Sequence, residues 1–175
     1  MVKPRTFPIS NPNHMTTTFP MTSMTPRMKS PVEVLPDALQ PIQAILAAAF
    51  KSGAPPAAHG LVHLRIAQIN GCAQCIDGGA KHAKHGGETD ERLFAISAWR
   101  EAPYFTEAER AALALAESIT RLSDRADPVP DQVWQQATHH FDESALAGLL
   151  LSIAMANFFN RLNVPTRQIA GTQKW

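Results

Sequence analysis

Two cysteines three residues apart are the clearest chemical signal in the sequence: Cys72 and Cys75, in the motif NGCAQC at residues 70–75. The chain of 175 residues contains only these 2 cysteines. A disulfide between them would close a loop too short to stabilise a fold of this size. We therefore predict that the pair has a chemical rather than a structural role. Residues three apart lie on the same face of a helix, where two sulfurs can meet.

The residues around the pair favour a reactive thiolate. The Asn-Gly step at residues 70–71 predicts a break in regular structure, and a helix is expected to begin at Cys72. The free N–H groups and the dipole at a helix N-terminus favour thiolate over thiol. A thiolate can attack a peroxide oxygen to become a sulfenic acid, with which the second thiol condenses to a disulfide. We therefore predict that Cys72 and Cys75 form a redox-active pair.

Two alternatives compete with this interpretation. Both cysteines could be inert core residues, since free cysteine is often buried, but the Asn-Gly break and the helix start argue against it. The pair could also hold zinc together with histidines, which lie nearby in the sequence at His59, His63, His82 and His85. The Cys-x2-Cys-x6-His-x2-His spacing is shorter than that of zinc fingers, and a core of this size does not need a metal to fold. We therefore predict neither a metal nor a cofactor.

The elements that must position the cysteines are predicted to be helices. Apolar residues recur at three- and four-residue steps, and no stretch shows the alternation of a strand. A thioredoxin-type motif, which follows a strand, is therefore excluded. We predict an all-α domain of about six to seven helices over residues 31–170. The expected helices cover residues 37–51, 57–69, 72–85, a segment capped by Thr89, 106–122 with a capping box formed by Thr106 and Glu109, 131–139 and 144–162.

Composition limits the classes of partner. The net charge is +1, from 16 basic and 15 acidic side chains, which leaves no electrostatic footprint for nucleic acid and no polybasic membrane patch. The longest apolar stretch, residues 145–156, is too short to span a bilayer. Residues 1–30 are rich in Pro, Thr and Met and lack the apolar core of a signal peptide, so we expect a disordered tail and a cytoplasmic protein. Further methionines in this tail leave the true start codon open.

An ordered set of segments resembles one known family. The stretch LRIAQINGCAQCID at residues 64–77 resembles the core signature of the alkylhydroperoxidase D-like branch of the carboxymuconolactone decarboxylase family. The resemblance extends over nearly the whole domain, from residue 31 to residue 167. Further matching segments follow in order at residues 87–88, 91–93, 97–100, 105–113 and 160–163.

The resemblance implies an all-α fold that works as a homo-oligomer, often a trimer or hexamer. It implies reduction of a peroxide or organic hydroperoxide, in which Cys75 attacks the peroxide and Cys72 resolves the product into a disulfide. It also implies a dithiol reductant, which in the best-studied branch is a dihydrolipoyl-bearing protein that lets the enzyme pass electrons to a partner peroxiredoxin.

The sequence departs from that branch at two positions. The branch carries a Glu twelve residues before the first cysteine and a His four residues after the second, where this chain has Gly60 and Gly79. A His at the second position would lie over the sulfur of Cys75 and could accept the thiol proton. Gly79 can do neither, and we expect it to leave space beside the sulfur for a bulky hydroperoxide, a lipoyl arm or a side chain from a neighbouring subunit.

His63 is the candidate substitute for the missing proton-handling groups. It lies one turn from Gly60 on the same helix face, although a polar residue on a helix surface remains an equal alternative. His82 lies seven residues from Cys75, about 10 Å along a helix, which is too far for a direct hydrogen bond. We interpret His82 and His85 as surface residues. Glu109 and Arg110 are expected to cap a helix and to orient helices through an ion pair.

Three functions follow, in order of preference. The first is a thiol-dependent peroxidase or disulfide oxidoreductase, with Cys75, Cys72 and His63 as its catalytic residues. The second is an oligomeric redox sensor or scaffold whose cysteines cycle slowly. The third is a lactone decarboxylase, which ranks last because that branch does not depend on a Cys-x-x-Cys pair.

Overall fold

The fold is all-helical, as predicted. The computed structural model describes residues 24–172 and holds eight α-helices and no strand within that range. The helices are α1 (Pro31–Val34), α2 (Leu39–Phe50), α3 (Pro56–Asn70), α4 (Ala73–His85), α5 (Asp90–Ala95), α6 (Glu107–Thr120), α7 (Asp131–His140) and α8 (Glu143–Thr166). Three short 3-10 segments lie at Pro36–Ala38, Ile96–Ala98 and Leu122–Asp124. All seven predicted helices are present, and the single turn of α1 is additional.

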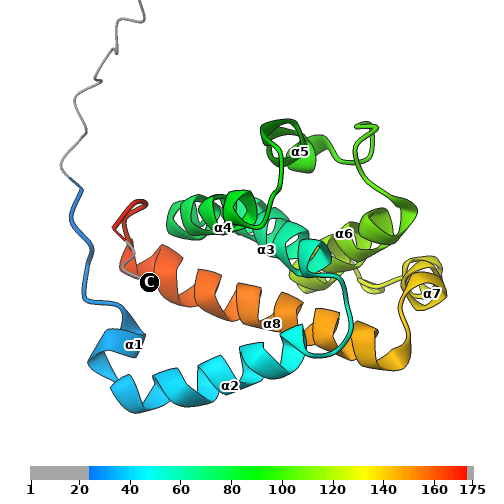
Figure 1. Cartoon of the computed structure of the whole chain (residues 1–175). Coiled ribbons are helices and arrows are strands. Elements are labelled where there is room, and N and C mark those ends of the chain that lie inside the picture. Colours follow the sequence, from blue (N-terminus) through cyan, green and yellow to red (C-terminus); the bar gives the residue numbers. More distant parts are fainter. Residues whose placement is uncertain (1–23, 173–175) are drawn as a thin grey trace, which may run out of the picture.

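Helix α3 lies at the centre of the domain. It contacts α4, α6 and α8, while α2 packs along the other side of α8 (Figure 1). Apolar residues of α3 therefore point in several directions, and Val62 and Ile66 are completely buried. They belong to a core between α3, α6 and α8 that includes Leu115 and Leu149. A second core, built around Leu61, Leu64, Ile96, Trp99 and Leu113, joins α3 and α6 to the segment before α6.

The turn between α3 and α4 sets the direction in which α4 leaves. Gly71 has a φ of +67°, the left-handed conformation that glycine adopts without penalty. The N–H of Cys72 donates to the carbonyl of Ala67 at 3.0 Å, and that of Gly71 donates to Gln68 at 3.3 Å. These two bonds form a Schellman motif. The end of α3 and the start of α4 are thus joined with Cys72 at the corner.

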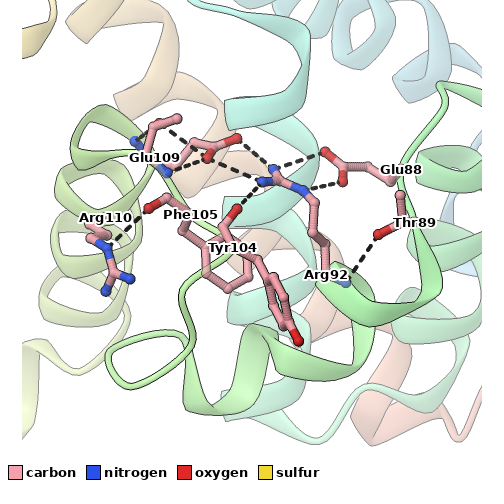
Figure 2. Close-up of polar contacts among 8 residues, drawn as sticks. Glu88, Thr89, Arg92, Tyr104, Phe105, Glu109 and Arg110 are labelled. Carbon is pink, nitrogen blue, oxygen red and sulfur yellow. Dashed lines mark hydrogen bonds and ion pairs between the residues drawn. The ribbon is translucent and has the colours of Figure 1, made fainter.

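The connection between α5 and α6 is held by Arg92. Figure 2 shows its guanidinium between the carboxylates of Glu88, at 2.7 Å, and Glu109, at 2.6 Å, and it also donates to the carbonyl of Tyr104. These hydrogen bonds raise the pKa of Arg92 above its usual value. Burial alone would raise the pKa of Glu109, but its bonds to Arg92 and Thr106 outweigh burial and lower it.

The same region contains the predicted capping box of α6. Thr106 Oγ1 accepts from the N–H of Glu109 at 3.3 Å, and the Glu109 carboxylate accepts from the N–H of Thr106 at 2.8 Å. Arg110 donates to the carbonyls of Trp99 and Phe105, at 3.0 and 3.1 Å. Glu109 and Arg110 therefore act as helix-orienting residues.

Helix α8 is longer than the sequence predicted. It continues four residues past 162, to Thr166, with Pro165 in its last turn. Helix α8 is long and apolar enough to cross a membrane. Half of its most apolar stretch is buried inside the domain, as expected of a core helix. Its C-terminal end is fastened to the N-terminal segment, because the backbone N–H of Arg27 donates to the carbonyl of Thr166 at 2.8 Å. The disordered tail was predicted for residues 1–30. Of these, residues 1–23 lie outside the described residues.

Candidate active site

The two cysteines form a disulfide at the N-terminus of α4. Their Cα atoms are 5.3 Å apart, and Cys72 and Cys75 are 2% and 4% exposed. Cys72 is the N-cap residue of α4, and its sulfur accepts from the N–H of Cys75 at 3.3 Å. Ala67 and Ile76 pack against the pair. The helix start therefore lies where the sequence predicted it, with the Cys72 sulfur beside a free N–H group of the first turn.

Asn163 of α8 also contacts the pair. Its Nδ2 donates to the sulfur of Cys75 at 3.4 Å, across a sequence separation of 88 residues. Among residues 24–172, it is the one side chain that hydrogen-bonds to either sulfur from outside the motif. Sequence reasoning missed this contact because it ended the helix at residue 162. Asn157, Asn160 and Asn163 recur at three-residue steps in a largely apolar helix, a pattern that marks a polar stripe but not the residue that Asn163 contacts.

Asn160 and Asn157 fix α8 against the end of α3. Asn70, the last residue of α3, donates through Nδ2 to Asn160 Oδ1 at 2.9 Å and to Asn157 Oδ1 at 3.0 Å. Asn157 in turn donates to the Thr120 hydroxyl of α6 at 3.2 Å. The segment that leads into the cysteine motif is thereby tied to two other helices.

The space beside Gly79 is filled by His63. A Cβ added at Gly79 would lie 2.8 Å from Cδ2 and 3.2 Å from Nε2 of His63, and 3.0 Å from a methyl carbon of Leu64. The expectation that Gly79 leaves this space open for a substrate is therefore wrong. The imidazole comes from α3 and lies over the glycine one turn along α4 from Cys75.

His63 is neutral in its surroundings at neutral pH. Burial lowers its pKa below the usual 6.5, and the nearby His82 lowers it further, while the hydrogen bond to the Cys75 carbonyl acts in the opposite direction. That contact joins His63 Nε2 to the Cys75 carbonyl oxygen at 3.4 Å. The imidazole thus touches the backbone of the redox residue, and a neutral ring retains a nitrogen that can accept a proton.

Three further histidines, His59, His82 and His85, make no hydrogen bond to either sulfur. His59 is 2% exposed, its Nδ1 lies 2.7 Å from the Ser152 hydroxyl, and its ring stacks on Phe50 at 4.6 Å. Burial lowers the pKa of His59. His82 and His85 are exposed, and the His85 ring bonds to the Lys81 carbonyl at 2.7 Å. Within residues 24–172, no group of three or more His, Cys, Asp or Glu side chains could hold a metal ion.

A buried carboxylate locks α3 to α6 behind the site. Glu117 accepts from Arg65 at 2.6 Å, from the Trp99 indole at 3.1 Å and from Arg100 at 2.6 Å. Burial alone would raise the pKa of Glu117, but the hydrogen bonds from Arg100, Trp99 and Arg65 together lower it. The network holds the helix that carries His63 in a fixed position.

Two surface hollows flank the domain without reaching the sulfurs. One, of about 290 Å³, lies between α6 and α7 beside Trp99 and His140. The other, of about 340 Å³, lies between Asn70 and the last turns of α8 at Asn160 and Arg161. Neither is lined by a cysteine.

Comparison with known proteins gives the same family that the sequence motifs resemble. The chain matches the sequence profile of the carboxymuconolactone decarboxylase family over residues 36–118. It is 36% identical over 104 residues to the uncharacterized protein YdfG of Bacillus subtilis, an alignment that covers 59% of this chain and 69% of YdfG.

Solved structures share the fold over most of this chain. A protein of unknown function from Agrobacterium tumefaciens, described as a candidate antioxidant defence protein AhpD, superposes with a TM-score of 0.77 and 28% identity. The match covers 85% of this chain and all of that one (100%). The debrominase Bmp8 shares the fold with a TM-score of 0.71 at 18% identity, over 81% of this chain and 75% of its own. The cysteine motif, the helical fold and these relatives together show that the chain belongs to the carboxymuconolactone decarboxylase family, in its alkylhydroperoxidase D-like branch.

Proposed function

We propose that this protein is a cytoplasmic thiol-dependent peroxidase that reduces a peroxide or organic hydroperoxide through Cys72 and Cys75. The observation that carries the proposal is the disulfide between these residues at the N-terminus of α4. A helix N-terminus favours the thiolate that must attack, and the partner thiol is already within bonding distance for resolution.

The chemistry balances as three steps. The Cys75 thiolate attacks one peroxide oxygen, the O–O bond breaks, and the alcohol leaves with one added proton while Cys75 becomes a sulfenic acid. The Cys72 thiol then attacks the Cys75 sulfur, water leaves, and the disulfide forms. An external dithiol reduces this disulfide by exchange and becomes a disulfide itself.

His63 is the residue that we propose for proton transfer. Its neutral imidazole lies over Gly79, one turn from Cys75, on the face of α4 where a family histidine would begin. A neutral imidazole can accept the thiol proton and return it to the departing alcohol oxygen. Nε2 lies 3.4 Å from the Cys75 carbonyl and can bond to that oxygen only as a donor. The ring must therefore leave this bond, with Nε2 unprotonated, before it takes the thiol proton.

A slender dithiol is the reductant that fits this site best. Both sulfurs are nearly buried, so a bulky protein thiol would meet the surrounding helices before it reached them. A dihydrolipoyl group on a long flexible arm avoids that obstacle. We therefore propose a lipoyl-bearing protein as the electron donor.

A second copy of the chain is the partner that we propose for the outer face of α8. Ala147, Leu151, Ala154 and Phe158 follow one another at steps of four, three and four residues and all face solvent. This is the spacing at which two helices pack side by side. We expect Leu151→Glu to lower the trimeric or hexameric mass measured by light scattering. Leu122→Glu, at an apolar residue that is 56% exposed elsewhere, is the control and should leave the mass unchanged.

A slow redox sensor is the second candidate, and the burial of both sulfurs favours it. A sensor needs one oxidation per signal rather than rapid access for substrate and reductant. It would form the Cys72–Cys75 disulfide when treated with peroxide, without sustained turnover.

Turnover of cumene hydroperoxide with dihydrolipoamide separates the two candidates. A peroxidase consumes many equivalents of hydroperoxide per chain, whereas a sensor consumes about one. Cys75→Ser should abolish turnover, and Cys72→Ser should allow a sulfenic acid at Cys75 to be trapped by dimedone. Full hydroperoxide turnover in the double Cys→Ser variant would contradict both candidates. Activity of that variant on a lactone substrate would indicate the third function, a lactone decarboxylase.

A further inference from the structure

The contact between Asn163 and Cys75 is buried on both sides. The two residues are 9% and 4% exposed, and the amide nitrogen faces the sulfur at 3.4 Å. In such a setting water competes little for either group, so a hydrogen bond is electrostatically stronger than at the surface. A bond from an N–H to an anion is also stronger than one to a neutral acceptor. The donor therefore favours the thiolate over the thiol.

The structure holds Asn163 in this position from both sides along α8. Its backbone carbonyl accepts from the N–H of Gln168 at 3.0 Å and from the Thr166 hydroxyl at 3.3 Å, within the helix C-cap. One turn earlier, Asn160 is bound to Asn70 at 2.9 Å. These bonds fix the backbone from which the Asn163 side chain extends, and none of them involves the sulfur.

Charged groups near Cys75 are engaged elsewhere. On α4, Asp77 accepts from Lys81 at 2.8 Å and from the N–H of Gly171 in the C-terminal turn at 3.0 Å. On α3, burial lowers the pKa of His63, and its ring bonds to a carbonyl. On α8, Arg161 donates to Asn157 at the exposed surface. Among the described residues, the donor from another helix that reaches the sulfur is therefore a neutral amide.

We propose that Asn163 is a positioning residue of the redox pair, whose side-chain N–H stabilises the Cys75 thiolate and holds its sulfur toward Cys72. The inference rests on the proposed function in one respect, that Cys75 reacts as a thiolate. The inference also covers the step in which an external dithiol reduces the Cys72–Cys75 disulfide. When an external dithiol attacks the Cys72 sulfur, the S–S bond breaks, a mixed disulfide forms on Cys72, and Cys75 leaves as a thiolate that the same N–H stabilises.

The test measures the thiolate directly, without peroxide. In a Cys72→Ser background, Cys75 is the single thiol, and its alkylation by iodoacetamide is followed against pH. Asn163→Leu removes the donor at nearly constant volume, and Asn163→Ala removes it without added bulk, so one variant remains informative if the other fails to fold. We expect the pH midpoint to rise by about one unit, roughly a tenfold loss of thiolate at neutral pH.

Ser152→Ala is the control, because Ser152 is a buried polar residue on the same helix that bonds to His59 and does not touch a sulfur. Its midpoint should equal that of the parent. An unchanged midpoint in both Asn163 variants overturns the inference, and so does an equal rise in Ser152→Ala, which would mark a purely structural effect. A rise confined to Asn163 together with no hydroperoxide turnover in the wild type would sustain the inference and reject the proposed function.

Discussion

The imidazole of His63 occupies the space that a side chain at Gly79 would need. A Cβ at residue 79 would lie 2.8 Å from His63 Cδ2, a distance that side-chain atoms do not tolerate. The His63 ring on α3 thus packs against Gly79 on α4, where there is no side chain to compete for the space. The chain has Gly79 where the resemblance implies a histidine, and an imidazole from α3 packs against that glycine.

This complementarity predicts that Gly79→Ala destabilises the protein even though alanine is the better helix former. The added methyl group forces His63 to move, and overpacking of this kind costs about 1–3 kcal/mol. In a His63→Ala background the ring is gone, so Gly79→Ala should become neutral or stabilising. Urea unfolding of the four proteins gives the coupling energy between the two positions. Additive effects would show that the two residues do not compete for the same space.

His63 should matter for peroxide reduction more than His85 does. We expect His63→Ala to lower the hydroperoxide turnover number by about 10²-fold, as is typical for loss of a general base, and His85→Ala to leave it unchanged. His85 is the control because it is exposed and lies at the far end of α4. Equal rates in the two variants would remove His63 from the mechanism.

The same idea can be tested by moving the imidazole. Gly79→His added to His63→Ala places the ring on α4, where the space is now free. Recovery of turnover relative to His63→Ala would show that the position of the imidazole matters and not the helix that carries it. A variant with Gly79→Gln in the same background fills the space without a proton acceptor and should recover nothing.

Gly60 marks the other missing group, and there the space is open. Nothing lies within 4 Å of a Cβ added at this position. Gly60→Ala should therefore stabilise the protein by about 0.5–1 kcal/mol, because glycine inside a helix is costly. Gly60→Glu should raise the pKa of His63, three residues along the same face, since a nearby negative charge favours imidazolium. The pKa is read by NMR titration, with Gly60→Gln as the uncharged control. The same pKa in both variants would show that position 60 does not reach the imidazole.

Much of the fold follows from local sequence, but the pairing at the site does not. Thr89 and Thr106 begin helices where predicted because an N-cap hydroxyl satisfies N–H groups within the same turn. Helix α8 passes its predicted end, and the carbonyls of residues 165 and 166, which have no partner within the helix, accept from Arg27. That contact spans 138 residues and has no local signal.

The same reasoning separates the parts of the site. The cysteine pair was predictable because its geometry arises within one turn of helix. The Asn163 contact and the fit of His63 over Gly79 were not, because each arises only when two separate helices pack together. The sequence shows the types and positions of these residues, but it does not show which of them contact one another in the fold.

Acidification should weaken the fold through His59, which is buried, and His63, which is partly buried. Burial lowers the pKa of both His59 and His63 below the usual 6.5, so the unfolded chain binds protons that the folded chain does not. Their contribution to stability is therefore present above pH 6.5 and is lost as the pH falls from there toward the folded-state values. Each such proton makes the free energy of unfolding fall by up to about 1.4 kcal/mol per pH unit. The carboxyls of Asp77, Glu109 and Glu117, whose pKa values are also lowered, act in a more acidic range.

Urea unfolding between pH 5 and pH 8, roughly the range in which histidines titrate, measures this dependence. The wild type should lose stability below pH 6.5, the usual pKa of histidine, and His63→Gln should lose less per pH unit, whatever its absolute stability. His85→Gln, at an exposed imidazole, provides the matched control, and its slope should equal that of the wild type. If His63→Gln kept the full slope, the proton uptake would have to be assigned to His59, and His63 would titrate in the folded protein as it does in the unfolded chain.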